Sequence, residues 1–269
     1  MHYKFLSAIG ISAIALTAAQ PASADSFKLK PIIDARLRYE GVDQDGLAKA
    51  ADALTMRMRS GVEATSGPFS VLVEAEATLA LSEHYNSGVN GKAAYPIVAD
   101  PENVELNRIQ IQYKGLPKTV VTIGRQRINL DDQRFVGSVG WRQNEQTFDA
   151  ARIEWTGIKN LKADVTYAWS QRTIWGVDGF GTRQQAVSGD NILANLSWKL
   201  KTGTITGFAY IVDQDEAAVT YLAQPFSLSS QTYGGRAAFS VPLSKAIKLN
   251  LLASYARQSD YGRNPVDYA

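Results

Sequence analysis

The sequence predicts an all-β protein, an antiparallel up-and-down β-barrel that spans a membrane. Three observations lead to this prediction. The N-terminus has the features of an export signal, and no later stretch is apolar enough for a helical membrane span. Strand-like segments of about ten residues follow one another, each with alternating apolar and polar positions. A soluble all-β sandwich also shows alternation and remains the competing architecture.

The first segment has the three parts of a secretory signal peptide. Lys4 supplies the positive charge, residues 5–19 form the apolar region, and Ala22-Ser23-Ala24 fits a cleavage site. The apolar run is too short for a membrane anchor. We therefore expect a cleaved leader at 1–24 and a single barrel domain at 25–269.

Composition excludes several function classes. The chain has no cysteine and two histidines, of which only His84 lies beyond the leader. A thiol nucleophile is thereby excluded, and a histidine-based metal site or catalytic triad is disfavoured. A formal net charge of +2 gives no basic face for nucleic acid. We expect no enzyme activity, no cofactor and no metal.

The first three expected strands cover residues 27–40, 52–65 and 69–82, separated by a polar loop and a tight turn at Ser66-Gly67-Pro68. The third has the clearest alternation. Its apolar positions are Phe69, Val71, Val73, Ala75, Ala77, Leu79 and Leu81. Ser70, Glu74, Glu76 and Thr78 occupy the other face, so one face is suited to lipid and the other to water.

Eight further strands follow the same pattern, beyond a long loop at about 83–103. They cover about 104–114, 119–127, 145–156, 161–170, 191–200, 204–212, 232–241 and 247–258. Long loops are expected at 173–190 and 213–229. The other connections are short turns at 115–118, 157–160, 201–203 and 242–246. This alternation is typical of outer-membrane barrels, whose periplasmic turns are short and whose external loops are long.

The expected strand number is eleven, whereas single-chain bacterial barrels have even numbers. Residues 259–269 do not form a closing strand with an apolar, aromatic end. We therefore expect the sequence to be an incomplete piece of a barrel of about 16–18 strands. A miscount by one, giving ten or twelve strands, is the alternative.

If the apolar positions face lipid, the alternate positions line the lumen, where arginines can attract anions. The candidates from this alternation are Arg36, Arg38, Arg57, Arg59, Arg108 and Arg152. Lysines occupy the same parity at 28, 30, 114, 162, 199 and 248. The competing interpretation is that the arginines pair with Glu74 and Glu76 on neighbouring strands and only brace the wall.

The stretch 124–150 contains four arginines, Arg125, Arg127, Arg134 and Arg142, together with Asp131 and Asp132. Arg125 and Arg127 share the parity of apolar positions, so we expect either a bulge at Gly124 or an early end of the strand. The aspartates have poor spacing for a calcium loop, and pairing with the arginines is favoured. We expect a loop folded toward the pore; a salt-bridged rim is the alternative.

The same stretch resembles the alginate-export family of Gram-negative outer-membrane barrels. The similarity is specific in residues 124–135, 137–143 and 146–150 and extends to Ala35–Glu40 and Arg57–Gly61. The resemblance implies an 18-stranded pore with an arginine-rich constriction that passes a polyanionic polysaccharide. By position it makes Arg125, Arg127, Arg134 and Arg142 pore-facing candidates, with Asp131 and Asp132 as acidic partners.

We therefore predict an outer-membrane channel for small anions or an alginate-like oligo- or polysaccharide. Its expected surroundings are outer-membrane lipid and periplasmic export partners, without nucleic acid. A general diffusion porin with weak selectivity and a non-conducting scaffold or receptor are the alternatives.

Overall fold

The computed structural model describes the backbone of residues 3–6, 10–12, 27–179, 183–215, 219–221, 224–226, 228–262 and 264. Side chains are described for 27–179, 183–215, 228–262 and 264. Nowhere in these ranges does a helix have the length and apolarity needed to cross a membrane.

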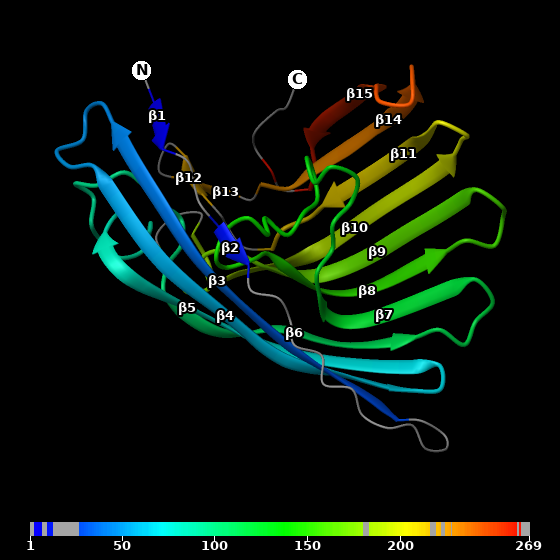
Figure 1. Ribbon diagram of the computed structural model, residues 1–269, viewed down its shortest axis with the longest axis horizontal. Helices are drawn as coiled ribbons and strands as arrows, with labels where there is room; N and C mark the ends of the chain where they lie inside the picture. The colour runs from blue at the N-terminus through cyan, green and yellow to red at the C-terminus, as the bar shows by residue number, and fades with distance from the viewer. Residues whose placement is uncertain are drawn as a thin grey trace. The chain divides into compact units, whose positions relative to one another are not determined.

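Eleven long strands make up the fold (Figure 1). They are β3 (Lys28–Gln44), β4 (Ala51–Ser66), β5 (Phe69–His84), β6 (Asn103–Tyr113), β7 (Thr119–Gln126), β8 (Thr147–Trp155), β9 (Leu161–Arg172), β10 (Ala186–Lys199), β11 (Gly203–Val212), β14 (Ser230–Pro242) and β15 (Lys248–Asp260). Four short strands accompany them: β1 (Tyr3–Leu6), β2 (Gly10–Ser12), β12 (Val219–Tyr221) and β13 (Gln224–Phe226).

The hydrogen-bonded order of the long strands follows the chain from β3 to β15, with β1 and β2 both paired to β3. The β12–β13 hairpin is separate. The prediction of eleven antiparallel strands is thus confirmed. The order is linear, as in an open rather than a closed sheet.

The predicted strand ends need correction in two places. β10 begins at Ala186, inside the expected loop 173–190, because the backbone N–H of Thr173 donates to the carbonyl of Gln185 at 3.0 Å and continues the pairing. The expected loop 213–229 contains the β12–β13 hairpin. β1 and β2 fall within the predicted leader, whose cleavage stays a prediction.

Burial on the two faces of the strands is the reverse of that in a soluble protein, because the polar side chains are buried and the apolar side chains are exposed. In β5, Glu74 and Glu76 are each 1 % exposed, whereas Leu79 is 47 % and Leu81 55 % exposed. The same inversion recurs in β9, where Thr166 is buried and Val165 exposed. A soluble sandwich would bury the apolar residues, so this arrangement fits a sheet with lipid on its apolar face. We refer below to the polar face and the apolar face.

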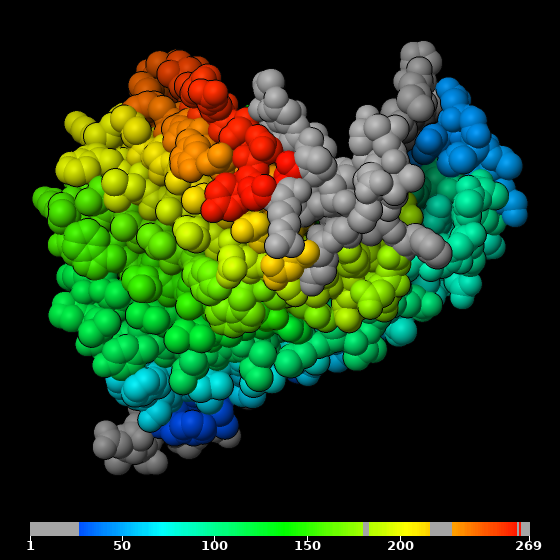
Figure 2. Space-filling view, turned by 180° about the vertical axis from the view of Figure 1, so that it is seen from behind, coloured from blue at the N-terminus to red at the C-terminus, as the bar shows by residue number. Residues whose placement is uncertain are grey.

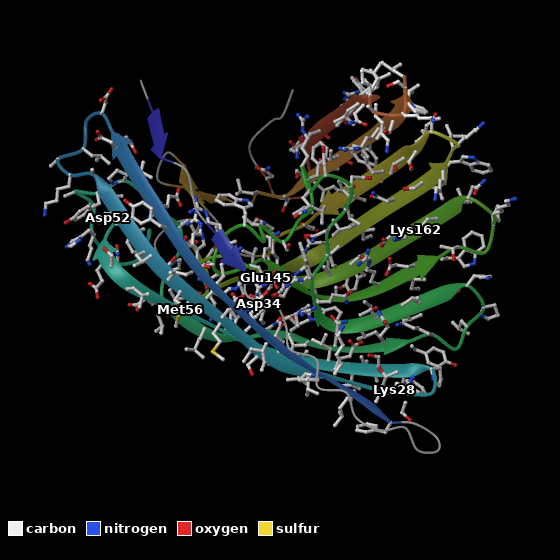
Figure 3. The ribbon with its side chains drawn as sticks, in the orientation of Figure 1. Lys28, Asp34, Asp52, Met56, Glu145 and Lys162 are labelled. Carbon is white, nitrogen blue, oxygen red and sulfur yellow. The ribbon has the colours of Figure 1, made fainter. Side chains whose placement is uncertain are left out.

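The chain forms two compact units. Unit 1 comprises residues 1–111, 124–148 and 171–187, and unit 2 comprises 112–123, 149–170 and 188–269. In unit 2, β11, β14 and β15 pair in sequence and lie side by side in both views (Figures 1 and 2). In unit 1, Lys28 and Asp52 lie toward opposite ends of the β3–β4 pair (Figure 3).

A small apolar core in unit 1 supports the long loop 85–102. Tyr85 and Val98 from this loop pack with Ala51 and Ala53 of β4. Burial raises the pKa of Tyr85, and its hydroxyl donates to the carbonyl oxygen of Asp100 at 2.8 Å. The core therefore fixes the place of Asp100, which the site uses.

Candidate functional site: a folded loop over charged strands

Loop 127–146 connects β7 to β8 and turns back over other strands of unit 1 (Figure 1). The side chain of Arg36 in β3 holds this loop by binding the backbone of the loop. The guanidinium donates to the carbonyl oxygens of Gly140 at 3.0 Å and Trp141 at 3.1 Å, and also to that of Arg142. Because all these acceptors are neutral, Arg36 acts here as an anchor for the loop.

Gln143 is the second anchor. Its side chain is fully buried, and its Oε1 accepts a hydrogen bond from Arg36 Nε at 3.1 Å. Its Nε2 donates to Thr55 of β4. A buried amide with its donors and its acceptor in use fixes the local geometry more firmly than one contact does.

Asp100 joins the two loops of unit 1. Its buried carboxylate accepts from the backbone N–H of Gln143 at 3.0 Å and pairs with Arg38. Arg142 lies 3.9 Å from the same carboxylate and 3.2 Å from Glu40. Burial lowers the pKa of Arg142, although the two carboxylates oppose this shift. Arginine nevertheless stays charged at neutral pH.

A chain of charged groups crosses β4, β5 and β6 beneath the loop. Arg59 pairs with Glu76 and also lies 3.3 Å from Glu145, which Arg127 approaches at 2.7 Å. Asn107 Nδ2 donates to Glu145 at 2.8 Å and to Glu74 at 2.9 Å.

Two further pairs extend this network. Arg108 of β6 binds Glu74 with two hydrogen bonds, of 2.9 and 2.7 Å. Arg57 pairs with Asp34. In β4 the buried Arg57 and Arg59 alternate with the less buried Met56 and Met58, of which Figure 3 labels Met56. The charged network therefore occupies the polar face.

Within most of these pairs the arginine is the more exposed partner. Side-chain exposure is 31 % for Arg127 against 1 % for Glu145, and 17 % for Arg108 against 1 % for Glu74. The pair of Arg57 and Asp34 is the reverse, with 4 % against 48 %. The carboxylates mostly lie behind the guanidinium groups, so the accessible surface is more basic than the number of charges indicates.

A cavity of about 360 Å³ opens between the loop and this surface. Arg59, Arg127 and Glu145 line one part of it, and Asn129 and Trp141 line another. Trp141 is 60 % exposed, with the guanidinium of Arg142 4.2 Å from its ring centre. The cavity thus combines cationic, amide and aromatic groups, which can hold an anionic, partly apolar solute.

The predicted site residues are placed in three ways. Unit 1 brings together Arg36, Arg38, Arg57, Arg59, Arg108, Arg127 and Arg142, with Glu74 and Glu76 among their partners. Arg152 lies in unit 2 and binds Asp164 at 2.8 and 2.6 Å. Arg134 is exposed, 5.7 Å from the ring of Phe135. Asp131 and Asp132 are exposed on the same loop, and Asp132 accepts the backbone N–H of Arg134 at 3.4 Å.

The break in alternation near Gly124 has a local cause. Gly124 has φ +112°, and a Cβ there would lie 2.3 Å from the carbonyl oxygen of Ile109. β7 ends at Gln126, so Arg127 belongs to the loop. Arg125 remains in the strand and donates to the carbonyl of Leu106 at 2.9 Å.

Sequence reasoning did not select Asp100, Asn107, Trp141, Gln143 or Glu145 as site residues. Gln143 and Glu145 lie in the polar run after Trp141, inside the stretch already singled out. Their polarity in such a stretch was a usable signal. Asp100 had none, because its role depends on where its loop folds.

Comparison with solved structures gives the same fold. The chain is similar to Acinetobacter baumannii OccAB1, with a TM-score of 0.65 and 14 % identity over 86 % of this chain and 52 % of that one. For A. baumannii OccAB3 the TM-score is 0.61 at 17 % identity, over 89 % and 60 %. For Pseudomonas aeruginosa OpdL it is 0.57 at 16 %, over 89 % and 59 %. These structures are outer-membrane porins, and this chain spans about half to three fifths of their length. No curated protein matches the sequence.

The family comparison agrees with the resemblance of the 124–150 stretch. The sequence model described as alginate export matches residues 30–210, which include all the strands and loops of the candidate site. The match covers more than half of the chain and places it in the bacterial outer membrane. This chain belongs to the alginate export family of outer-membrane β-barrel proteins.

Proposed function

We propose that the protein is an outer-membrane channel for anionic solutes, including an alginate-like polysaccharide. The solute passes along the arginine side of the polar face, next to loop 127–146, which narrows the path. No bond is made or broken, and no cofactor takes part.

The observation that carries this proposal is the unequal exposure within the ion pairs. Glu74, Glu145 and Asp100 lie behind their arginines, so a passing carboxylate meets guanidinium groups first. Guanidinium groups bind carboxylates with two parallel hydrogen bonds. Arg127 and Trp141 border the same cavity, which suits a solute with both a charge and a ring.

A second candidate function is a weakly selective diffusion channel. Its support is that most arginines of the network have an acidic partner, so the field of each pair falls off quickly with distance. Arg36 differs, because its acceptors in the described contacts are carbonyl oxygens. The two candidates differ in the expected preference for anions over cations.

The deciding experiment is the reversal potential of the full-length protein in a planar bilayer under a KCl gradient. Wild type is expected to prefer chloride. The single variant Arg127→Gln and the double variant Arg125→Ala/Arg127→Ala are each expected to lower the anion-to-cation permeability ratio by about two-fold or more. A preference for potassium in wild type contradicts the proposal.

Arg134→Gln is the matched control. It removes one arginine from the same loop, but Arg134 is exposed and does not border the cavity. Its permeability ratio is expected to match wild type. Equal losses in Arg127→Gln and Arg134→Gln would mean that only total charge matters, which favours the weakly selective channel.

A further inference from the structure

The short-turn end of unit 2 carries a dense group of lysines. Four short connections lie in this unit, and lysines occupy or flank all of them. The lysines are Lys114, Lys118, Lys159, Lys162, Lys199, Lys201, Lys245 and Lys248. All eight are exposed. We refer to this group as the lysine rim.

Backbone hydrogen bonds join the four connections into one row. The N–H of Thr156 donates to the carbonyl of Lys118 at 2.9 Å, and that of Lys199 donates to Asn160 at 2.7 Å. The N–H of Ser240 donates to Thr202 at 2.7 Å. Because neighbouring strands are about 4.8 Å apart, each connection lies roughly 10 Å from the next one in the row.

The rim has little counter-charge of its own. Its nearby acids are Glu154 and Asp164, and both already bind Arg152, at 3.4 Å and 2.6 Å. Lys162 completes this cluster, 2.7 Å from Glu154. Among the side chains that the structure describes, the other seven lysines form no ion pair. The rim therefore carries a positive field that the described part of unit 2 leaves uncompensated.

A cavity of about 410 Å³ lies within the rim. Its lining includes Lys159, Lys162 and Lys199, the hydroxyl-bearing Thr156, Ser197 and Thr204, and the apolar Ile158 and Leu161. Lysine ammonium groups and hydroxyl groups are suitable donors to carboxylate or phosphate oxygens. The cavity gives the rim a place where an anion can stay, in addition to a field that attracts it.

The alternation of the strands distinguishes a solute from a lipid at this place. Lys162 shares parity with the buried Asp164 and Thr166, and Lys199 shares parity with the buried Asn195. These lysines thus extend the polar face. A lipid headgroup would instead be met beside the apolar face, which carries the exposed Trp198 at this end of β10.

We infer that the lysine rim is a capture site for carboxylate- or phosphate-bearing solutes at the mouth on the short-turn side. Short turns mark the periplasmic side of such barrels. The inference rests on the proposed channel function and adds a direction to it. Anions from the periplasm associate faster than anions from outside, because clustered charge steers their approach.

The test is sided block of single-channel current by trigalacturonate in 0.1 M KCl, using the full-length protein. The chain has no cysteine, so Ala48→Cys in the β3–β4 loop, at the end of unit 1 that also carries loop 85–102, allows orientation to be assigned with a membrane-impermeant maleimide. Lys159→Gln/Lys199→Gln is expected to lower the association rate from the short-turn side about three- to ten-fold. The rate from the long-loop side stays unchanged.

Lys49→Gln/Lys92→Gln is the matched control, because it removes two lysines from the β3–β4 loop and the adjacent loop 85–102 of unit 1. It is expected to leave the short-turn rate unchanged. At 1 M KCl the effect of the rim variant shrinks to less than about two-fold, because the Debye length falls to about 3 Å. Bilayers of phosphatidylcholine alone give the same result as bilayers with added phosphatidylglycerol.

Three results overturn the inference: no rate change, equal changes from both sides, or a change only with phosphatidylglycerol. The last result assigns the rim to lipid headgroups. Failure of the channel proposal is separate, since it is seen as a cation preference of wild type in the KCl gradient. If wild type prefers anions but the rim variant shows no difference between the two sides, the inference about the lysine rim is wrong and the channel proposal stands.

Discussion

The side-chain amide of Gln143 donates to the carbonyl oxygen of Thr55 at 3.0 Å and to its hydroxyl at 2.9 Å, although 88 positions separate the residues. With Arg36 on the other side of the amide, this contact holds loop 127–146 against β3 and β4. The loop is thus held in place by strands that lie much earlier in the sequence.

Loss of this amide should loosen the loop. Gln143→Met keeps the length but leaves buried donors and acceptors unpaired, which costs about 1–3 kcal/mol. We expect a larger and noisier single-channel current, because the loop no longer stays against the polar face. Gln110→Met, a similar change on β6 away from the loop, should leave the current unchanged. A quiet, wild-type current in Gln143→Met would contradict the anchoring role.

Gly124 should tolerate no side chain. Gly124→Ala places a Cβ 2.3 Å from the Ile109 carbonyl at φ +112°, a conformation that costs a non-glycine residue about 1–3 kcal/mol before any clash. We expect the urea midpoint for unfolding in detergent to fall. In Gly140→Ala the nearest atom is Ser138 Oγ at 3.5 Å, so this control should stay near wild type. Equal midpoints would show that β7 can shift at this point.

The buried pair of Arg59 and Glu76 should behave as a coupled unit. Arg59→Met leaves the Glu76 carboxylate without its partner, and breaking such a pair costs about 3–5 kcal/mol. Arg59→Met/Glu76→Leu removes both charges and should recover part of the loss. Urea unfolding of the wild type, both single variants and the double variant completes the cycle. Purely additive losses would mean that the two charges do not stabilise each other.

The assignment of the two faces can be tested with one charge at neighbouring positions. Ile109 is 45 % exposed on the apolar face of β6, and Gln110 follows it on the polar face. Ile109→Arg should lower folding stability in lipid by about 2–4 kcal/mol, because it places a charge against hydrocarbon. Gln110→Arg should cost much less, since its face is hydrated. The intensity of the heat-resistant folded band in gel electrophoresis measures the stability of both variants. A greater loss in Gln110→Arg than in Ile109→Arg would mean that the lipid-facing and water-facing sides are assigned the wrong way round.

The strands were predictable because one physical requirement repeats along them. Lipid on one side and water on the other impose a period of two, which is visible in residues such as Val71, Val73 and Glu74. The start of β10 was missed because its first residues, around Gly189, are small and polar and show no such period.

The contacts of the site were less predictable. The sequence identified the arginines and suggested Glu74 and Glu76 as partners, and these carboxylates do bind Arg108 and Arg59. It did not indicate Asp100 or Glu145, because both lie in loops, where no repeating pattern constrains the side chains. Which arginine meets which loop residue depends on strand order and loop path, and neither is local in sequence.

The bonds of Gln143 to Arg36 and Thr55 have an evolutionary consequence. A loop held through a specific amide and a specific guanidinium cannot be exchanged between related barrels as an independent cassette, because the receiving strands must supply both partners. Positions 36, 55 and 143 should therefore change together among relatives. A chimera that receives loop 127–146 already carries Gln143, so its strands should need matching residues at positions 36 and 55 together.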